Sequence, residues 1–155
     1  MRIGLLRHGI AASGFGADFD RELTSEGWLQ LENVLDGLLR AGWAPRTILH
    51  SPFVRTTQTA ASVHARFPDV PCIATDELAL PSLEPILMAA SRHPDPLLVG
   101  HEPTMGNLCA RLLGAPSGGI RFERAGFALV EVDRLPATRP ARLVAFVSPT
   151  WLGAG

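Results

Sequence analysis

The sequence has no lysine, only two cysteines and no long apolar run, and each shortage argues against a class of protein. Two cysteines, Cys72 and Cys109, are too few for a disulfide framework. Without a signal peptide or an apolar stretch that could span a bilayer, we expect a cytoplasmic, reduced protein with no membrane association. The formal net charge of -1 gives no bulk attraction for nucleic acid or anionic membranes.

Several motifs that bind metals or cofactors are also missing. The histidines and cysteines show no close ligand spacing, so we expect no metal site. There is no carboxylate triad for magnesium, no Gly-x-x-x-x-Gly-Lys loop for a nucleotide and no Gly-x-Ser-x-Gly elbow for a serine nucleophile. We therefore expect no cofactor, and any phosphate binding must depend on local groups.

The length and composition of the chain predict one domain over residues 1–155, because the chain is 46% hydrophobic and long enough to form a sizeable core. Short apolar runs alternate with stretches of helical period, which predicts a three-layer α/β/α sandwich with a mostly parallel sheet. We expect strands at 3–6, 47–51, 72–74 and 97–100, helices at about 25–41, 52–67, 83–91 and 104–113, and a hairpin from 127–132 and 142–147.

The first of these strands runs directly into Arg7-His8-Gly9. Ligands in open α/β sheets bind beyond the carboxyl ends of the strands, so a guanidinium and an imidazole at this point predict a binding site. Gly9 allows the backbone to turn sharply or to approach a ligand closely. An isolated Arg-His-Gly tripeptide is equally compatible with a solvated strand end, so the prediction needs support from elsewhere in the chain.

Two later segments give that support. Ser51 is predicted to cap the second helix, whose apolar positions, Phe53 among them, indicate a buried face and whose first turn carries Arg55. The strand at 97–100 ends on His101, just before a further helix whose free N–H groups favour an anion. Since the carboxyl ends of parallel strands meet at one edge of a sheet, we expect Arg55 and His101 beside Arg7 and His8.

Two guanidinium groups and two imidazoles in one crevice predict a site for a dianion such as a phosphoryl group. A neutral imidazole has an ordinary pKa of about 6.5 and is available as a nucleophile near neutral pH. Phosphoryl transfer to a histidine, without a metal ion, is the chemistry that uses all four side chains.

Four ordered motifs give the chain a resemblance to a known family over nearly its whole length. They are Arg7-His8-Gly9, Leu23-Thr24-Ser25-Glu26-Gly27, the segment from Ser51 to Ala60 around Arg55, and Gly100-His101. With these motifs the sequence resembles the histidine phosphatase superfamily, the phosphoglycerate-mutase-like group, and in particular its small bacterial members of the SixA phosphohistidine phosphatase type.

The resemblance implies that His8 is phosphorylated during turnover and that Arg7, Arg55 and His101 hold the phosphoryl group. It also implies that Arg21, and Gly9 through its backbone, line the same pocket. Larger members carry an insertion with an acidic proton donor, for which this chain has no room. Among the carboxylates present, Glu77 at a strand-to-loop junction is the first candidate donor, with Glu84, Asp18 and Asp20 as alternatives.

A missing acid suits a labile phosphoramidate better than an alkyl phosphate, so we expect a phosphohistidine-bearing protein as substrate. Two alternatives stay open: a phosphomonoesterase of small phosphorylated molecules, and a non-catalytic module that binds phosphate or a phosphoprotein. The glycine-rich loop at 10–20 bears on this choice, because a lid over the pocket favours small molecules and a shallow pocket favours proteins.

Overall fold

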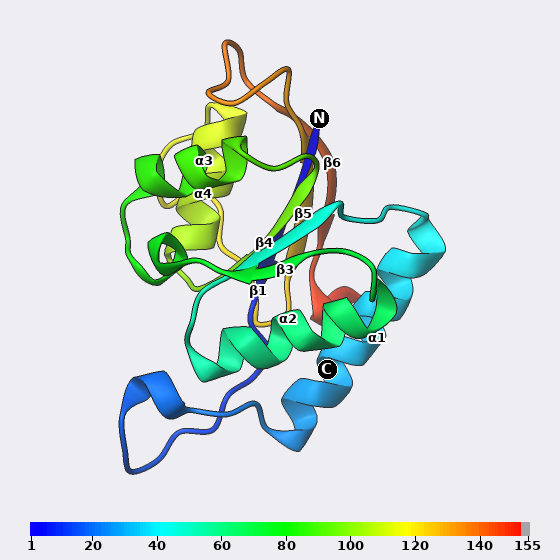
Figure 1. The fold of residues 1–155 in the computed structure, drawn as a ribbon, viewed down its shortest axis with the longest axis vertical. Coiled ribbons are helices and arrows are strands. Elements are labelled where there is room, and N and C mark those ends of the chain that lie inside the picture. Colours follow the sequence, from blue (N-terminus) through cyan, green and yellow to red (C-terminus); the bar gives the residue numbers. More distant parts are fainter. Residues whose placement is uncertain (153–155) are drawn as a thin grey trace.

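The computed structural model describes residues 1–152, and its central feature is a six-stranded sheet with the order β3-β2-β4-β1-β5-β6 (Figure 1). Its strands are β1 (Arg2–Arg7), β2 (Thr47–His50), β3 (Cys72–Ala74), β4 (Pro96–Gly100), β5 (Phe127–Glu131) and β6 (Arg142–Val147). The strands β1, β2, β3 and β4 pair in parallel, whereas β5 pairs antiparallel with both β1 and β6. The predicted sheet and hairpin are confirmed.

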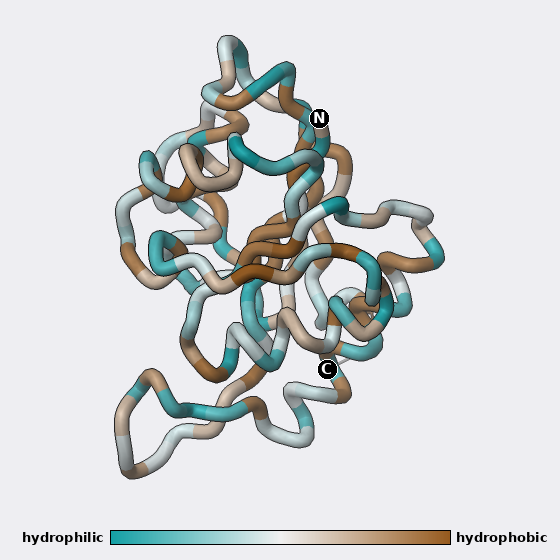
Figure 2. Tube along the Cα trace, viewed as in Figure 1, coloured by the Kyte–Doolittle hydropathy of each residue, from teal (hydrophilic) through white to brown (hydrophobic). Residues whose placement is uncertain are grey.

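Four helices cover the sheet: α1 (Ser25–Ala41), α2 (Val54–Arg66), α3 (Leu83–Ser91) and α4 (Thr104–Leu113). Leu31 of α1 and Val63 of α2 pack in one buried cluster with Leu6 of β1, while Ile86 of α3 and Leu108 of α4 pack in another on the opposite face. Figure 2 shows the strands between these helices as the most hydrophobic stretch of the chain. The three-layer α/β/α sandwich predicted from the sequence is therefore observed.

Local sequence signals set the ends of α1 as predicted. The Thr24 hydroxyl accepts a hydrogen bond from the Gly27 amide at 2.9 Å, and Gly42 ends the helix in the left-handed conformation with φ 79°. Three short 3-10 turns complete the described elements: η1 (Asp18–Asp20), η2 (Asp76–Ala79) and η3 (Pro149–Leu152). Within residues 1–152, no helix is long and apolar enough to cross a membrane.

Two predictions about the start of α2 are wrong. Ser51 is not its N-cap, because the helix begins at Val54 after Phe53, which makes no side-chain capping hydrogen bond. Nor does Phe53 join the core: its ring is half-buried and lies 5.0 Å from the Phe19 ring and 4.9 Å from the His101 ring, measured between centroids. The bend at 52–53 turns both residues toward the strand ends, where a functional site is expected.

The loop at 10–20 is fastened to α1 by close backbone contacts. Ala11 and Leu23 form an isolated antiparallel bridge, and the Thr24 amide donates to the Ile10 carbonyl at 2.9 Å. A Cβ placed on Gly27 would lie 2.2 Å from the same Ile10 carbonyl oxygen. Only glycine fits there without moving backbone, so Gly27 sets how closely the chain after β1 approaches α1.

We predict that Gly27→Ala destabilises the fold by about 1–3 kcal/mol, since the added methyl group overlaps a backbone oxygen. Gly37→Ala is a matched control in the same helix, because no heavy atom lies within 4 Å of its Cβ position. That change should stabilise by about 0.5–1 kcal/mol through helix propensity. Urea unfolding measures both, and equal effects would contradict the close approach.

Candidate active site

Backbone hydrogen bonds hold three strand ends together at one edge of the sheet. The β4 strand lies between β1 and β2, with Arg7 opposite Gly100 and His50 opposite Val99. Past the strands, the His8 amide donates to the Gly100 carbonyl and the Ser51 amide to the Val99 carbonyl, both at 3.1 Å. Arg7, His8, Ser51 and His101 consequently emerge side by side.

His8 is buried, and its hydrogen bonds fix which ring nitrogen carries the proton. Nδ1 lies 2.7 Å from the Gly9 carbonyl oxygen, which only accepts, so Nδ1 is the donor. The other nitrogen, Nε2, accepts from the Arg55 Nε–H at 3.3 Å. The Nε2 lone pair therefore faces the guanidinium, in the protonation state that a nucleophilic imidazole needs.

Burial lowers the pKa of His8 to about 3, against a partial opposing effect of its hydrogen bond to Gly9. His101, Arg55 and Arg7 lower it further, because each disfavours a second positive charge beside it. Burial likewise lowers the pKa of His101 to about 4, with Arg55 and Arg7 acting in the same direction and Asp18 against them. Both rings are consequently neutral at physiological pH.

Arg55 is buried near the start of α2 and reaches across the site. Besides its contact with His8, its Nη1 donates to the Asp18 carbonyl oxygen at 2.8 Å and its Nη2 to the Asp18 carboxylate at 3.2 Å. The guanidinium carbon lies 4.9 Å from the centroid of the Phe53 ring, over its face. The structure thus brings Arg55 to His8, and it also places a carboxylate on the guanidinium fork.

Arg21 reaches this group only through Asp18. Its Nη1 donates to the Asp18 carboxylate at 2.9 Å and its Nε to the Ala12 carbonyl at 2.7 Å. The mostly exposed Asp18 carboxylate therefore bridges Arg21 and Arg55, and their hydrogen bonds, that of Arg21 foremost, lower its pKa. Sequence reasoning gave Asp18 no role as a counter-ion, because its place depends on how the loop at 10–20 folds back.

Arg7 presents a guanidinium with unused donor capacity. Its Nη1 donates to the Phe122 carbonyl at 2.8 Å, which orients the group, while its buried Nε has no hydrogen-bond partner among residues 1–152. Burial lowers the pKa of Arg7, the negative charge of Glu102 raises it, and Arg124 and Arg55 lower it. A buried N–H group without a hydrogen-bond partner destabilises the fold. An anion bound here would accept a hydrogen bond from the Arg7 Nε–H and remove this cost.

His101 completes the group and lies next to the His8 ring. The centroids of the two imidazole rings are 5.4 Å apart, and His101 Nε2 lies 2.8 Å from the Ser51 hydroxyl. Its buried Nδ1 has no hydrogen-bond partner in the described part of the chain. Ser51 and Phe53, which contact His101 from the segment before α2, were predicted only as a helix cap and a core residue.

Two further predicted residues have different surroundings. The Gly9 amide donates to the Thr59 hydroxyl at 3.2 Å, so this N–H is already engaged. Glu77 lies half-buried in η2, one turn beyond β3, and no hydrogen bond joins its side chain to the other site residues described. Among residues 1–152, no three His, Cys, Asp or Glu side chains are grouped closely enough to hold a metal ion.

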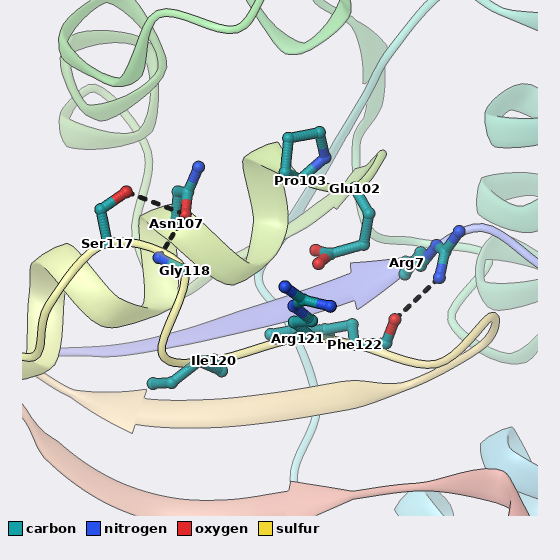
Figure 3. A pocket seen from close by; sticks show the side chains of 9 residues that line it. All are labelled: Arg7, Glu102, Pro103, Asn107, Ser117, Gly118, Ile120, Arg121 and Phe122. Carbon is teal, nitrogen blue, oxygen red and sulfur yellow. Dashed lines mark hydrogen bonds between the residues drawn. The ribbon is translucent and has the colours of Figure 1, made fainter.

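A cavity of 510 Å³ adjoins this group on the α4 side (Figure 3). Arg7 lines it together with Glu102, Asn107, Arg121 and Phe122. Because Arg7 lies both at the strand ends and in the cavity wall, the two spaces share one guanidinium. The arrangement combines a site for an anion with room for the group attached to that anion.

Comparisons with known proteins agree with this geometry. Residues 3–79 match the family described as the histidine phosphatase superfamily (branch 1). An uncharacterized protein of Picosynechococcus sp. is 29% identical over 163 residues, which cover 98% of this chain and 99% of that protein.

Solved structures resemble the whole chain. The protein assigned as phosphohistidine phosphatase SixA of Agrobacterium tumefaciens is 29% identical with a TM-score of 0.79, covering 96% of this chain and 97% of that one. A protein histidine phosphatase SixA in complex with tungstate is 25% identical with a TM-score of 0.80, covering 98% and 99%. The α-ribazole phosphatase of Shigella flexneri, 18% identical with a TM-score of 0.75 over 96% and 97%, shares the fold.

We predict that the His8 ring stays neutral from pH 8 down to about pH 4, because burial lowers its pKa to about 3. Nitrogen-15 NMR of the histidine rings should show His8 Nε2 unprotonated and Nδ1 protonated throughout this range, with His8→Gln identifying the signals. A titration midpoint near the ordinary value of about 6.5 would contradict the environment described.

Proposed function

We propose that this chain, which belongs to the histidine phosphatase superfamily, is a metal-independent phosphatase that removes the phosphoryl group from phosphohistidine in a partner protein. The observation that carries the proposal is the His8 ring: it is neutral, its Nδ1 donates to Gly9, and its Nε2 faces Arg55. A nucleophile is thereby held ready without a separate base.

In the first step, His8 Nε2 attacks phosphorus, the bond from phosphorus to the leaving nitrogen or oxygen breaks, and its electron pair departs with that atom. The phosphorylated His8 ring carries a positive charge, which the Gly9 carbonyl stabilises through the Nδ1–H. In the second step, water attacks phosphorus, and the His8 ring leaves as neutral imidazole with its Nδ1 proton still in place.

The two guanidinium groups stabilise the equatorial oxygens of the phosphoryl group. Arg7 offers its Nε–H, and Arg55 offers the donors that now contact Asp18. A dianion competes with the exposed Asp18 carboxylate for Arg55. It carries twice the charge of the carboxylate and also contacts the fixed guanidinium of Arg7, whereas Asp18 pairs with Arg21 and Arg55 at the exposed side of the site. His101 Nδ1, which lacks a partner among the described residues, provides a further contact. Preorganised charge of this kind needs little rearrangement during the reaction.

Two observations support a protein substrate. The tip of the loop at 10–20 projects away from the body of the molecule, and Phe15 in it is fully exposed (Figure 1). The turn at Asp18–Asp20 is the part of the loop that contacts the site, through Asp18 on Arg55 and Phe19 on the Phe53 ring. The projecting tip does not lie over the strand ends (Figure 1). An open site admits a side chain presented by another protein, and the two SixA structures share this fold at 25–29% identity.

The remaining assignments belong to the same proposal. We place the enzyme in the cytoplasm, with neither nucleic acid nor membrane as a partner. Gly9 supports the phosphate site by holding His8, and Arg21 supports it by holding Asp18. Glu77 is the proposed proton donor for leaving groups that need one, so Glu77→Gln should lower kcat/KM for an alkyl phosphate while leaving that for para-nitrophenyl phosphate unchanged. Equal kcat/KM for the alkyl phosphate in both proteins would contradict this role.

Replacing the nucleophile gives the sharpest test. His8→Ala should abolish the hydrolysis of para-nitrophenyl phosphate and the formation of an acid-labile phosphoenzyme, because no other group forms the intermediate. Arg55→Ala should cost about 3 kcal/mol of transition-state stabilisation, roughly a hundredfold in kcat/KM. Each assay is run with and without a chelator, so that a metal-dependent activity is recognised by its loss when the chelator is added.

Arg66→Ala provides a control in the same helix. The Arg66 guanidinium pairs with Glu32 and Asp36 on α1, away from His8, so kcat/KM should stay within about twofold of the wild type. Appreciable turnover by His8→Ala, or an acid-stable phosphoenzyme in the wild type, would contradict the proposed intermediate.

A further inference from the structure

The cavity beside Arg7 contains a carboxylate that the proposed mechanism does not use. Glu102 follows His101 directly in the chain, and its side chain points into the cavity between Arg7 and Arg121 (Figure 3). The cavity wall is tied together by Asn107, whose side-chain oxygen accepts from the Gly118 amide at 3.0 Å and the Ser117 hydroxyl at 3.2 Å. These hydrogen bonds hold the loop at 117–118 against α4, and both line the cavity.

Glu102 is held in place by the first turn of α4. Its Oε1 accepts a hydrogen bond from the Gly106 amide at 2.6 Å. A Cβ on Gly106 would lie 2.9 Å from Glu102 Oε2 and 2.2 Å from the Ile120 carbonyl oxygen, so this carboxylate position requires glycine at 106. One oxygen is thus anchored, and the carboxylate is presented in a fixed orientation.

The charge of Glu102 is also unpaired. Within the described chain, residues 1–152, it forms no ion pair within 4.0 Å, although it is half-buried. Its charge does act on Arg7, where it opposes the lowering of the pKa by burial. Of its two oxygens, only Oε1 accepts a hydrogen bond within residues 1–152. Oε2 is therefore left to accept from a ligand that brings a positive charge or a strong donor.

We propose that Glu102 binds the leaving group of the substrate and selects one that is a cationic ring, the imidazolium of phosphohistidine. This inference rests on the proposed function, since the phosphoryl group must sit on Arg7 and His8 for its substituent to enter the adjoining cavity. The carboxylate accepts a hydrogen bond from the ring N–H that lies opposite the phosphorylated nitrogen.

This contact accounts for cleavage without an acid at the scissile bond. When the remote ring nitrogen is protonated, the bond from nitrogen to phosphorus breaks with its electron pair passing to the ring, which leaves as neutral imidazole. Without that proton the leaving group is an imidazolate anion, a much poorer one. Glu102 favours the protonated ring by its charge and therefore favours the form that reacts.

Arg121 lies on the exposed rim of the same cavity and has the opposite charge. Its guanidinium disfavours a cationic leaving group, whereas Glu102 favours one. Removing the charge of Glu102 and removing that of Arg121 should therefore change substrate preference in opposite directions. A general disturbance of the cavity would change it in the same direction in both variants.

The test compares kcat/KM for phosphoimidazole and for para-nitrophenyl phosphate, whose leaving group has no cationic ring. Glu102→Gln keeps an oxygen for the Gly106 amide and should lower kcat/KM for phosphoimidazole about tenfold, with less than twofold change for para-nitrophenyl phosphate. Arg121→Ala should raise the preference for phosphoimidazole. Glu131→Gln, at the opposite edge of the sheet where it pairs with Arg2 and Arg142, should change neither substrate.

Equal losses on both substrates in Glu102→Gln, or no loss on either, would overturn the inference. So would a selective loss of phosphoimidazole activity in Glu77→Gln instead, since the leaving group would then lie at η2. His8→Ala distinguishes this failure from that of the proposed function. If that variant is inactive on both substrates while Glu102→Gln keeps the wild-type ratio, the phosphohistidine mechanism stands and only the role of Glu102 falls.

Discussion

The hydrogen bond from His8 Nδ1 to the Gly9 carbonyl is the interaction on which the site depends. It fixes the ring proton on the side away from Arg55 and leaves Nε2 as an acceptor at 3.3 Å from the guanidinium. Burial beside two arginines keeps the ring neutral. The sheet supports this geometry, because the pairing of β4 with β1 and β2 brings the His101 ring next to the His8 ring and the Ser51 hydroxyl next to His101.

Two carboxylates lie beside the arginines of the site, one at Arg55 and one at Arg7. Asp18 occupies the fork of Arg55 from the loop at 10–20, and Glu102 faces the cavity beside Arg7 from the start of α4. Each compensates part of the positive charge that a phosphoryl group needs. Asp18 lies where the phosphoryl group binds, so it favours the release of phosphate. We place Glu102 where the leaving group binds, so it selects among substrates.

The fold and the principal site residues could be predicted because they depend on backbone periodicity. Buried strands and helical stripes fix the parallel sheet, and the parallel sheet brings Arg7, His8 and His101 to one edge. Ser51, Phe53 and Asp18 could not be placed in this way. Their positions depend on a bend before α2 and on the return path of a glycine-rich loop, where no regular spacing relates sequence to direction. Glu102 was missed because its role depends on a cavity formed by segments distant in sequence.

The central claim, that a dianion is held by Arg7, His8, Arg55 and His101, is tested most directly by a crystal structure of the protein with bound tungstate. The account predicts one tungstate within hydrogen-bond distance of all four side chains, with its metal centre facing His8 Nε2 and the Asp18 carboxylate displaced from Arg55. Tungstate bound elsewhere, or an Asp18–Arg55 pair that persists with the anion bound beside it, would contradict the account.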